Sequence, residues 1–101
     1  MNQNLKIEQA VIGSILMDND CMYQIYNTLK AEMFQWEFTR ECYKIMLAMY
    51  DRGQAIDLMT VASELSNPTM SDEMIAEQLS ECVIAVDSSV FVKNKADLII
   101  K

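Results

Sequence analysis

Apolar side chains recur along this chain with the spacing of amphipathic helices. In residues 7–17 they fall three and four positions apart, and the same spacing continues in residues 21–29. This period places them on one face of a helix, whereas the side chains of a strand would alternate. A third helix is predicted for residues 39–52, because its apolar positions cover much of the circumference, as is typical of a central helix. We expect Asp20 and Thr39 to cap the second and third helices.

The third predicted helix ends at a turn that leads directly into a fourth. Gly53 follows Arg52, and glycine is the usual residue where a helix stops in a left-handed conformation. Asp57 then precedes an apolar stripe that ends near Leu65. Its side chain can accept the free amide hydrogens of the turn that follows. We therefore expect a short fourth helix that is capped by Asp57.

The remaining sequence predicts one loop and two more helices. Pro68 closes off any helix that would continue past the preceding residue, so residues 66–69 are expected to form a loop. A fifth helix is expected to start at Thr69 or Ser71. A sixth is expected from about Ser89 to the end of the chain.

An aromatic connector, residues 30–38, joins the second and third predicted helices. It contains Phe34, Trp36 and Phe38. Stacking on nucleic-acid bases would need cationic neighbours, but the acidic Glu32 and Glu37 flank these rings. Packing into the core is therefore the favoured interpretation, and anchoring of a partner is the alternative.

Composition places these helices in one domain. A chain of 101 residues is large enough for a single core but not for two. It has one proline and two glycines, which favours helices with short connections because turn-rich β folds use both residues heavily. We predict an all-α fold, a compact orthogonal bundle of about six helices, in a single domain over residues 1–101. Neither a membrane span nor the apolar core of a signal peptide is evident, so we expect a soluble cytoplasmic protein.

Candidate chemistry is sparse along the chain. There is no histidine, and the three cysteines, Cys21, Cys42 and Cys82, are widely separated. Buried free thiols are therefore expected rather than a disulfide or a metal site. The nucleotide-binding loop Gly-x-x-x-x-Gly-Lys-Ser/Thr is absent, and Gly13 and Gly53 alone cannot build a phosphate cradle. We predict no catalytic, cofactor-binding or metal-binding residue, and no enzymatic activity of this chain.

Negative charge is concentrated in the second half of the chain. The net charge is −7, and neither Lys nor Arg occurs from Gly53 through Val92. Since nucleic-acid binding depends on cations that neutralise phosphates, no direct binding to DNA is expected. Glu73, Glu77 and Glu81 share one face of the fifth predicted helix and are the candidate partner-binding residues. They form either a docking strip for a basic surface or a solvated outer face, and charge runs are usually solvated.

Two stretches resemble the N-terminal domain of DnaB-type replicative helicases. Residues 53–61, Gly-Gln-Ala-Ile-Asp-Leu-Met-Thr-Val, are similar to the family's Gly-x-Pro-Ile-Asp-Leu-Val-Thr-Leu segment. Residues 8–19, Glu-Gln-Ala-Val-Ile-Gly-Ser-Ile-Leu-Met-Asp-Asn, are similar to its Glu-Gln-x-x-Leu-Gly-x-x-Leu opening with the acidic-Asn helix end. Gly13, Gly53 and Asp57 are the structural residues of these two motifs. The order and spacing of the motifs identify the chain as a member of that family.

The resemblance implies a place in DNA replication. In that family this domain is the non-catalytic collar of a hexameric, ATP-dependent DNA helicase. It contributes to ring assembly and interacts with primase and helicase loader proteins. ATP and Mg²⁺ are then cofactors of a longer parent protein and not of this chain. Residues 89–101 would correspond to the start of a truncated hairpin helix, so this chain is expected to be a monomer or a weak dimer.

A standalone regulator is the alternative hypothesis. A small acidic protein of this fold could bind a replicative helicase or a primase and inhibit it. Inhibition of unwinding by excess free chain would favour this alternative. The chain ends in Leu98-Ile99-Ile100-Lys101, an apolar helical turn without a cap. Such an ending favours a domain of a longer protein.

Overall fold

The chain folds as helices in the parts that the structure, a computed structural model, describes: residues 3–65, 70–86 and 92–100. No strand occurs in these three ranges. In chain order the elements are α1 (Gln3–Met17), α2 (Asp20–Ile25), the 3-10 helix η1 (Ala31–Met33), α3 (Glu37–Asp51), α4 (Leu58–Glu64), α5 (Asp72–Ile84) and α6 (Val92–Ile100). The all-α class and the six α-helices predicted from the sequence are confirmed.

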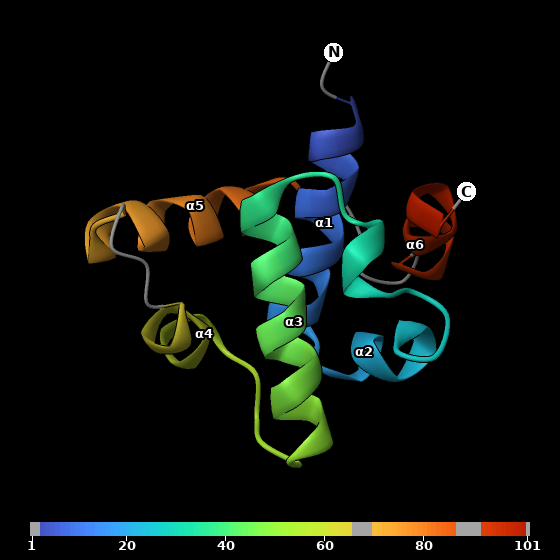
Figure 1. Ribbon diagram of the computed structural model, residues 1–101, viewed down its shortest axis with the longest axis horizontal. Coiled ribbons are helices and arrows are strands. Elements are labelled where there is room, and N and C mark those ends of the chain that lie inside the picture. The colour runs from blue at the N-terminus through green and yellow to red at the C-terminus, as the bar shows by residue number, and fades with distance from the viewer. Residues whose placement is uncertain (1–2, 66–69, 87–91, 101) are drawn as a thin grey trace.

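Helix α1 lies at the centre of the bundle. It packs most extensively against α5 and α6, and it also contacts α2 and α3 (Figure 1). The neighbouring Val11 and Ile12 and the following Ile15 are all fully buried, because partners cover α1 on more than one side. Helix α3, the predicted central helix, buries Tyr43 and Met46 beside it.

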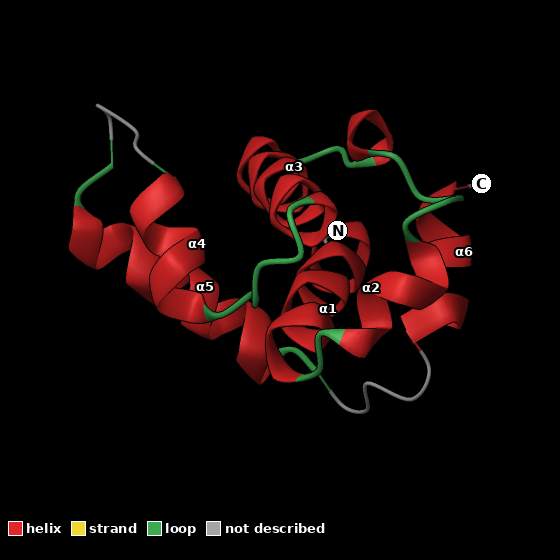
Figure 2. Cartoon of the chain, turned by 90° about the horizontal axis from the view of Figure 1, so that it is seen from below, coloured by secondary structure: helices red, strands yellow, loops and turns green. Residues whose placement is uncertain are grey.

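The remaining helices form two flanks on either side of α1 and α3. Figure 1 and Figure 2 both place α4 with α5 on one side and α2 with α6 on the other. The radius of gyration is 12.2 Å, close to the ~13 Å expected for a compact domain of about 100 residues. The two flanks therefore close over one core. Separately, none of the described helices is both long and apolar enough to cross a membrane.

The aromatic connector contributes unequally to this core. Phe34 is buried, and the centroid of its ring lies 4.9 Å from that of Tyr43. This separation is typical of favourable aromatic pairs. Phe38 is partly buried, whereas Trp36 keeps 40% of its surface exposed. Core packing is thus confirmed for Phe34, but the connector is not buried as a unit.

Two of the predicted helix caps are wrong. Asp20 is the first residue of α2, and Asn19 occupies the N-cap position without a capping side-chain hydrogen bond. Thr39 lies inside the first turn of α3, and Trp36 is the N-cap residue there. The Thr39 hydroxyl instead donates to Glu8 Oε1 of α1 at 2.6 Å. A contact with another helix has therefore replaced the local cap.

The first two helices also differ in length from their predictions. Helix α1 begins at Gln3, four residues before the first position of its apolar stripe. Helix α2 ends at Ile25, and a turn follows it before Leu29. This turn contains Asn27 and Thr28, two residues of low helix propensity. Leu29 is nevertheless buried, as its place in the apolar pattern predicts.

The fifth helix starts at one of its two predicted positions. Ser71 is the N-cap residue of α5, and its Oγ accepts a hydrogen bond from the Met74 amide at 3.2 Å. The other candidate, Thr69, lies outside the described residues together with the rest of the predicted loop. The same holds for Ser89, the expected start of the sixth helix, of which residues 92–100 are described.

Candidate partner-binding surface

The two sequence motifs meet in the structure through Asn19. Its Nδ2 donates to the carbonyl oxygens of Ile15 at 2.9 Å and Ile56 at 2.8 Å. Its Oδ1 accepts from the Ile56 amide at 2.7 Å. Asn19 thereby closes the end of α1 and holds the segment that leads into α4. This contact between the two motifs thus positions the start of α4.

Replacing Asn19 by Ala should loosen this attachment. The change removes three hydrogen bonds and leaves both backbone groups of Ile56 without their partner. At about 1 kcal/mol for each bond, we expect the free energy of unfolding to fall by about 2–3 kcal/mol in urea titrations followed by circular dichroism. Asn27→Ala, at an exposed position, is the matched control and should change it by less than about 0.5 kcal/mol. Equal stability of the two variants would contradict the role of Asn19.

Asp57 caps α4, as the sequence predicted. Its Oδ1 accepts from the Thr60 amide at 2.8 Å, while Thr60 Oγ1 accepts from the Asp57 amide at 3.3 Å, which completes a capping box. The hydrogen bonds from the Thr60 backbone and hydroxyl lower the pKa of the Asp57 carboxyl below its ordinary value. They do so because they stabilise the charged form.

Because the pKa of the Asp57 carboxyl is lowered in the folded state, the free energy of unfolding should depend on pH. A carboxyl whose pKa is lower in the folded state contributes stability above its unfolded pKa of about 3.9. That contribution is lost as the pH falls through the folded pKa. Asn can still cap a helix, so Asp57→Asn should flatten the dependence of unfolding free energy on pH between about 2 and 5, as urea titrations would measure. Thr60→Val keeps the backbone hydrogen bond and should retain part of the slope; an unchanged slope in Asp57→Asn would contradict the assignment.

The two glycines are required for different geometric reasons. Gly53 has a φ angle of 69°, the left-handed conformation that was predicted at the end of α3. Gly13 lies where α1 passes α5. A Cβ atom at Gly13 would lie 2.6 Å from Val86 Cγ2 and 2.7 Å from the carbonyl carbon of Cys82. Both distances are too short for any side chain, so glycine is required for this approach of the helices.

Glu8 is a buried carboxylate for which no role was predicted from the sequence. It is 2% exposed and accepts hydrogen bonds from the amides of Gln35 at 2.8 Å and Trp36 at 3.3 Å, in addition to the Thr39 hydroxyl. These donors lie just before α3 and in its first turn, so Glu8 caps the start of α3 from a different helix. A negative charge is favourable at this end of a helix. The sequence indicated the burial of Glu8 only through its position four residues before Ile12, which places both side chains on the same side of α1.

The three candidate partner-binding residues share an exposed face of α5. Glu73, Glu77 and Glu81 are all exposed, whereas Ile75 and Leu79 of the same helix are buried. Within the described part of the chain none of the three glutamates forms an ion pair. The three glutamates therefore lie on an exposed face, which both interpretations require, and the binding of a partner to it stays a prediction.

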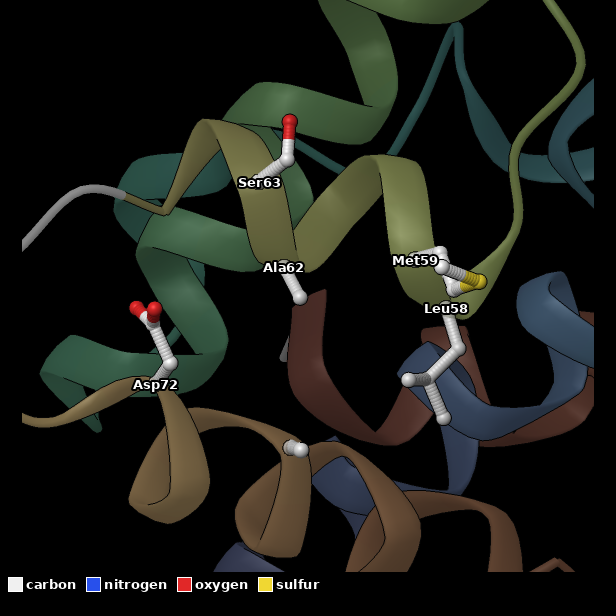
Figure 3. A pocket seen from close by; sticks show the side chains of 6 residues that line it. Leu58, Met59, Ala62, Ser63 and Asp72 are labelled. Atoms are coloured by element: carbon white, nitrogen blue, oxygen red, sulfur yellow. The ribbon is translucent and has the colours of Figure 1, made fainter.

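An open groove with a volume of about 400 Å³ separates α4 from α5. Its lining consists of Leu58, Met59, Ala62 and Ser63 from α4, with Asp72 and Ala76 from α5. Figure 3 shows Asp72 at one end, Leu58 and Met59 at the other, and Ala62 between them. The groove thus has an acidic end and an apolar end.

The thiols of Cys21, Cys42 and Cys82 are all buried, as predicted. Burial raises the pKa of the Cys82 thiol to about 12, and it also raises the pKa of Cys42. These two thiols therefore stay protonated at neutral pH, and a thiol in this form is a poor nucleophile. Among the described residues no cluster of acidic or cysteine side chains could hold a metal ion.

Comparison with known proteins supports the resemblance in sequence. A family model described as the DnaB-like helicase N terminal domain matches residues 1–101. Replicative DNA helicase DnaC of Bacillus subtilis (strain 168) is 35% identical over 72 residues, which cover 71% of this chain and 16% of that protein. Replicative DNA helicase DnaB of Geobacillus stearothermophilus is 30% identical over 98 residues, which cover 96% of this chain and 22% of that protein. The chain therefore spans about a fifth of the length of these curated relatives.

A solved structure has the same fold. It is the crystal structure of the N-terminal domain of DnaB helicase from Mycobacterium tuberculosis, with a TM-score of 0.85 and 26% sequence identity. The superposition covers 95% of this chain and 69% of that one. The fold predicted from the sequence is thereby confirmed against a crystal structure.

Proposed function

Since this chain belongs to the family of DnaB-like helicase N-terminal domains, we propose that it recruits partner proteins for a replicative DNA helicase. The partners are primase and helicase loader proteins, and the domain also contributes to the assembly of the helicase ring. DNA unwinding with ATP and Mg²⁺ is the work of the rest of the helicase, in the cytoplasm. This domain takes part through its surface and not through bond-making groups.

The surface of the α4–α5 flank is the observation that carries this proposal. Glu73, Glu77 and Glu81 line its outer face, and no Lys or Arg occurs between residues 53 and 92. Large apolar side chains are exposed on the same two helices, among them Met59 (80% exposed) and Ile84 (74% exposed). Apolar anchors within a charged rim are typical of protein–protein interfaces. The negative charge disfavours DNA as the ligand.

Binding to primase and to the loader from the same replication system tests this proposal. Surface plasmon resonance with immobilised chain should detect at least one of the two proteins. Because the attraction is partly electrostatic, the association rate should fall as the salt concentration rises. A variant with Glu73, Glu77 and Glu81 changed to Gln should associate more slowly than the wild type. If neither protein binds at low salt, the proposed function is wrong.

A further inference from the structure

We propose that the groove between α4 and α5 binds a basic segment of a partner protein. An apolar side chain of that segment inserts over Ala62 and Ala76, and a Lys or Arg of the segment contacts Asp72. This inference rests on the proposed function, because it gives the chemistry of the partner that the domain recruits.

The apolar half of the groove suits an inserted side chain. Ala62 and Ala76 are small and only partly buried, so neither fills the space between the two helices. The volume of about 400 Å³ lies within the range of about 300–1,000 Å³ that is usual for binding pockets. Met59, at the apolar end, is 80% exposed. Its flexible thioether can adapt to the shape of an incoming group.

The acidic half of the groove selects a basic occupant. Asp72 lines the groove, and Glu73 follows it in the same exposed first turn of α5. Arg52, the cation that reaches α4, is already engaged, since its Nη2 lies 2.9 Å from Glu64 Oε2 and 2.8 Å from Gln54 Oε1. No Lys or Arg in the described part of this flank neutralises Asp72 and Glu73. A partner cation would supply the missing charge, whereas an acidic segment would be repelled.

The position of the groove leaves it open to another protein. It lies on the α4–α5 flank, on the opposite side of α1 and α3 from α6 (Figure 2). A second copy of this chain is a poor occupant because each copy carries a net charge of −7. The charge of the groove, together with its apolar floor, therefore points to a basic and amphipathic partner segment.

An NMR titration tests the groove directly. The probe is a synthetic 16-residue peptide with Leu at helical spacing and Lys at the other positions, and the matched peptide carries Glu in place of Lys. We expect the basic peptide to shift the amide signals of residues 58–63 and 72–76, and the acidic peptide to leave them unchanged. Shifts confined to another surface, or equal shifts with both peptides, would overturn the proposal. So would shifts in the groove that depend on the concentration of the chain alone, because a second copy would then be the occupant.

Variants separate this proposal from the proposed function. Ala62→Phe fills the groove and should weaken binding of the basic peptide at least about ten-fold, while Ala48→Phe, at an exposed position on α3, should not. Asp72→Asn should weaken binding of the basic peptide about three-fold and reduce its salt dependence, and this variant serves if Ala62→Phe does not fold.

If wild type and the groove variants bind primase or loader equally well, the groove proposal is wrong and the proposed function stands. If only the basic peptide binds, the proposed function is wrong and the groove serves a different protein.

Discussion

Replacing Gly13 by Ala should lower the free energy of unfolding by about 3 kcal/mol, the upper end of what overpacking costs. Helix propensity alone predicts the opposite sign, a gain of about 1 kcal/mol for Gly→Ala inside a helix. The contact with α5 decides between them, because the added Cβ would lie 2.7 Å from the carbonyl carbon of Cys82. A backbone group cannot turn aside as a flexible side chain can, so α5 itself must shift. Urea unfolding followed by circular dichroism would measure the change.

Gly53→Ala is the matched control for this experiment. No atom lies within 4 Å of a Cβ at Gly53, so the only cost is that of its positive φ angle. That cost is about 1–2 kcal/mol for a residue other than glycine. We therefore expect Gly13→Ala to be the less stable of the two. A Gly13→Ala variant that is as stable as the wild type would show that α1 and α5 do not approach this closely.

Glu8→Gln should lower the free energy of unfolding by about 2–4 kcal/mol. The carboxylate accepts hydrogen bonds on both oxygens, from the amides of Gln35 and Trp36 and from the Thr39 hydroxyl. Gln offers one acceptor oxygen, and its NH₂ group would face a donor. Hydrogen bonds to a buried charged group contribute about 1.5–3 kcal/mol each, and leaving a buried donor without a partner adds a further cost. Thermal and urea unfolding would both register the loss.

A local readout distinguishes this effect from a general loss of stability. Trp36 belongs to the segment that Glu8 holds, so its fluorescence should change in Glu8→Gln before global unfolding begins. Glu32→Gln, at an exposed position on η1 close to the same segment in sequence, should leave both fluorescence and stability near those of the wild type. If the two variants behave alike, the buried carboxylate does not cap α3.

The features that the sequence predicted correctly depend on near neighbours along the chain. Asp57 caps α4 through Thr60, three residues away, and Ser71 caps α5 through Met74, also three residues away. Gly53 ends α3 by its own backbone conformation. Rules of local geometry contain all of this information, so one sequence was enough to predict it.

The features that were missed depend on distant partners. Thr39 is of a residue type that often caps helices, but its hydroxyl donates a hydrogen bond to Glu8, 31 residues away. Asn19 binds the backbone of Ile56 across 37 residues. Nothing near either residue in the sequence indicates its partner. Such pairs follow only after α1, α3 and α4 have been placed against one another.

The groove illustrates a different limit of the apolar pattern. Leu58, Val61, Ala62 and Leu65 fall on one predicted apolar face of the fourth helix. In the structure Val61 and Leu65 are buried, whereas Leu58 and Ala62 are only partly buried and line the groove. Periodicity identifies apolar positions but does not distinguish a position in the core from one that lines an open groove.

The three buried thiols provide this domain with internal reporters of its own breathing motions. Cys21 lies on α2, Cys42 on α3 and Cys82 on α5, beside the contact with Gly13. An alkylating reagent can reach each sulfur only when the surrounding helices separate, so the rate of labelling measures how often that happens. Mass spectrometry after a timed pulse would rank the opening of the three helices in the unmodified protein. The same pulse with a bound partner would show which of the helices that partner holds closed.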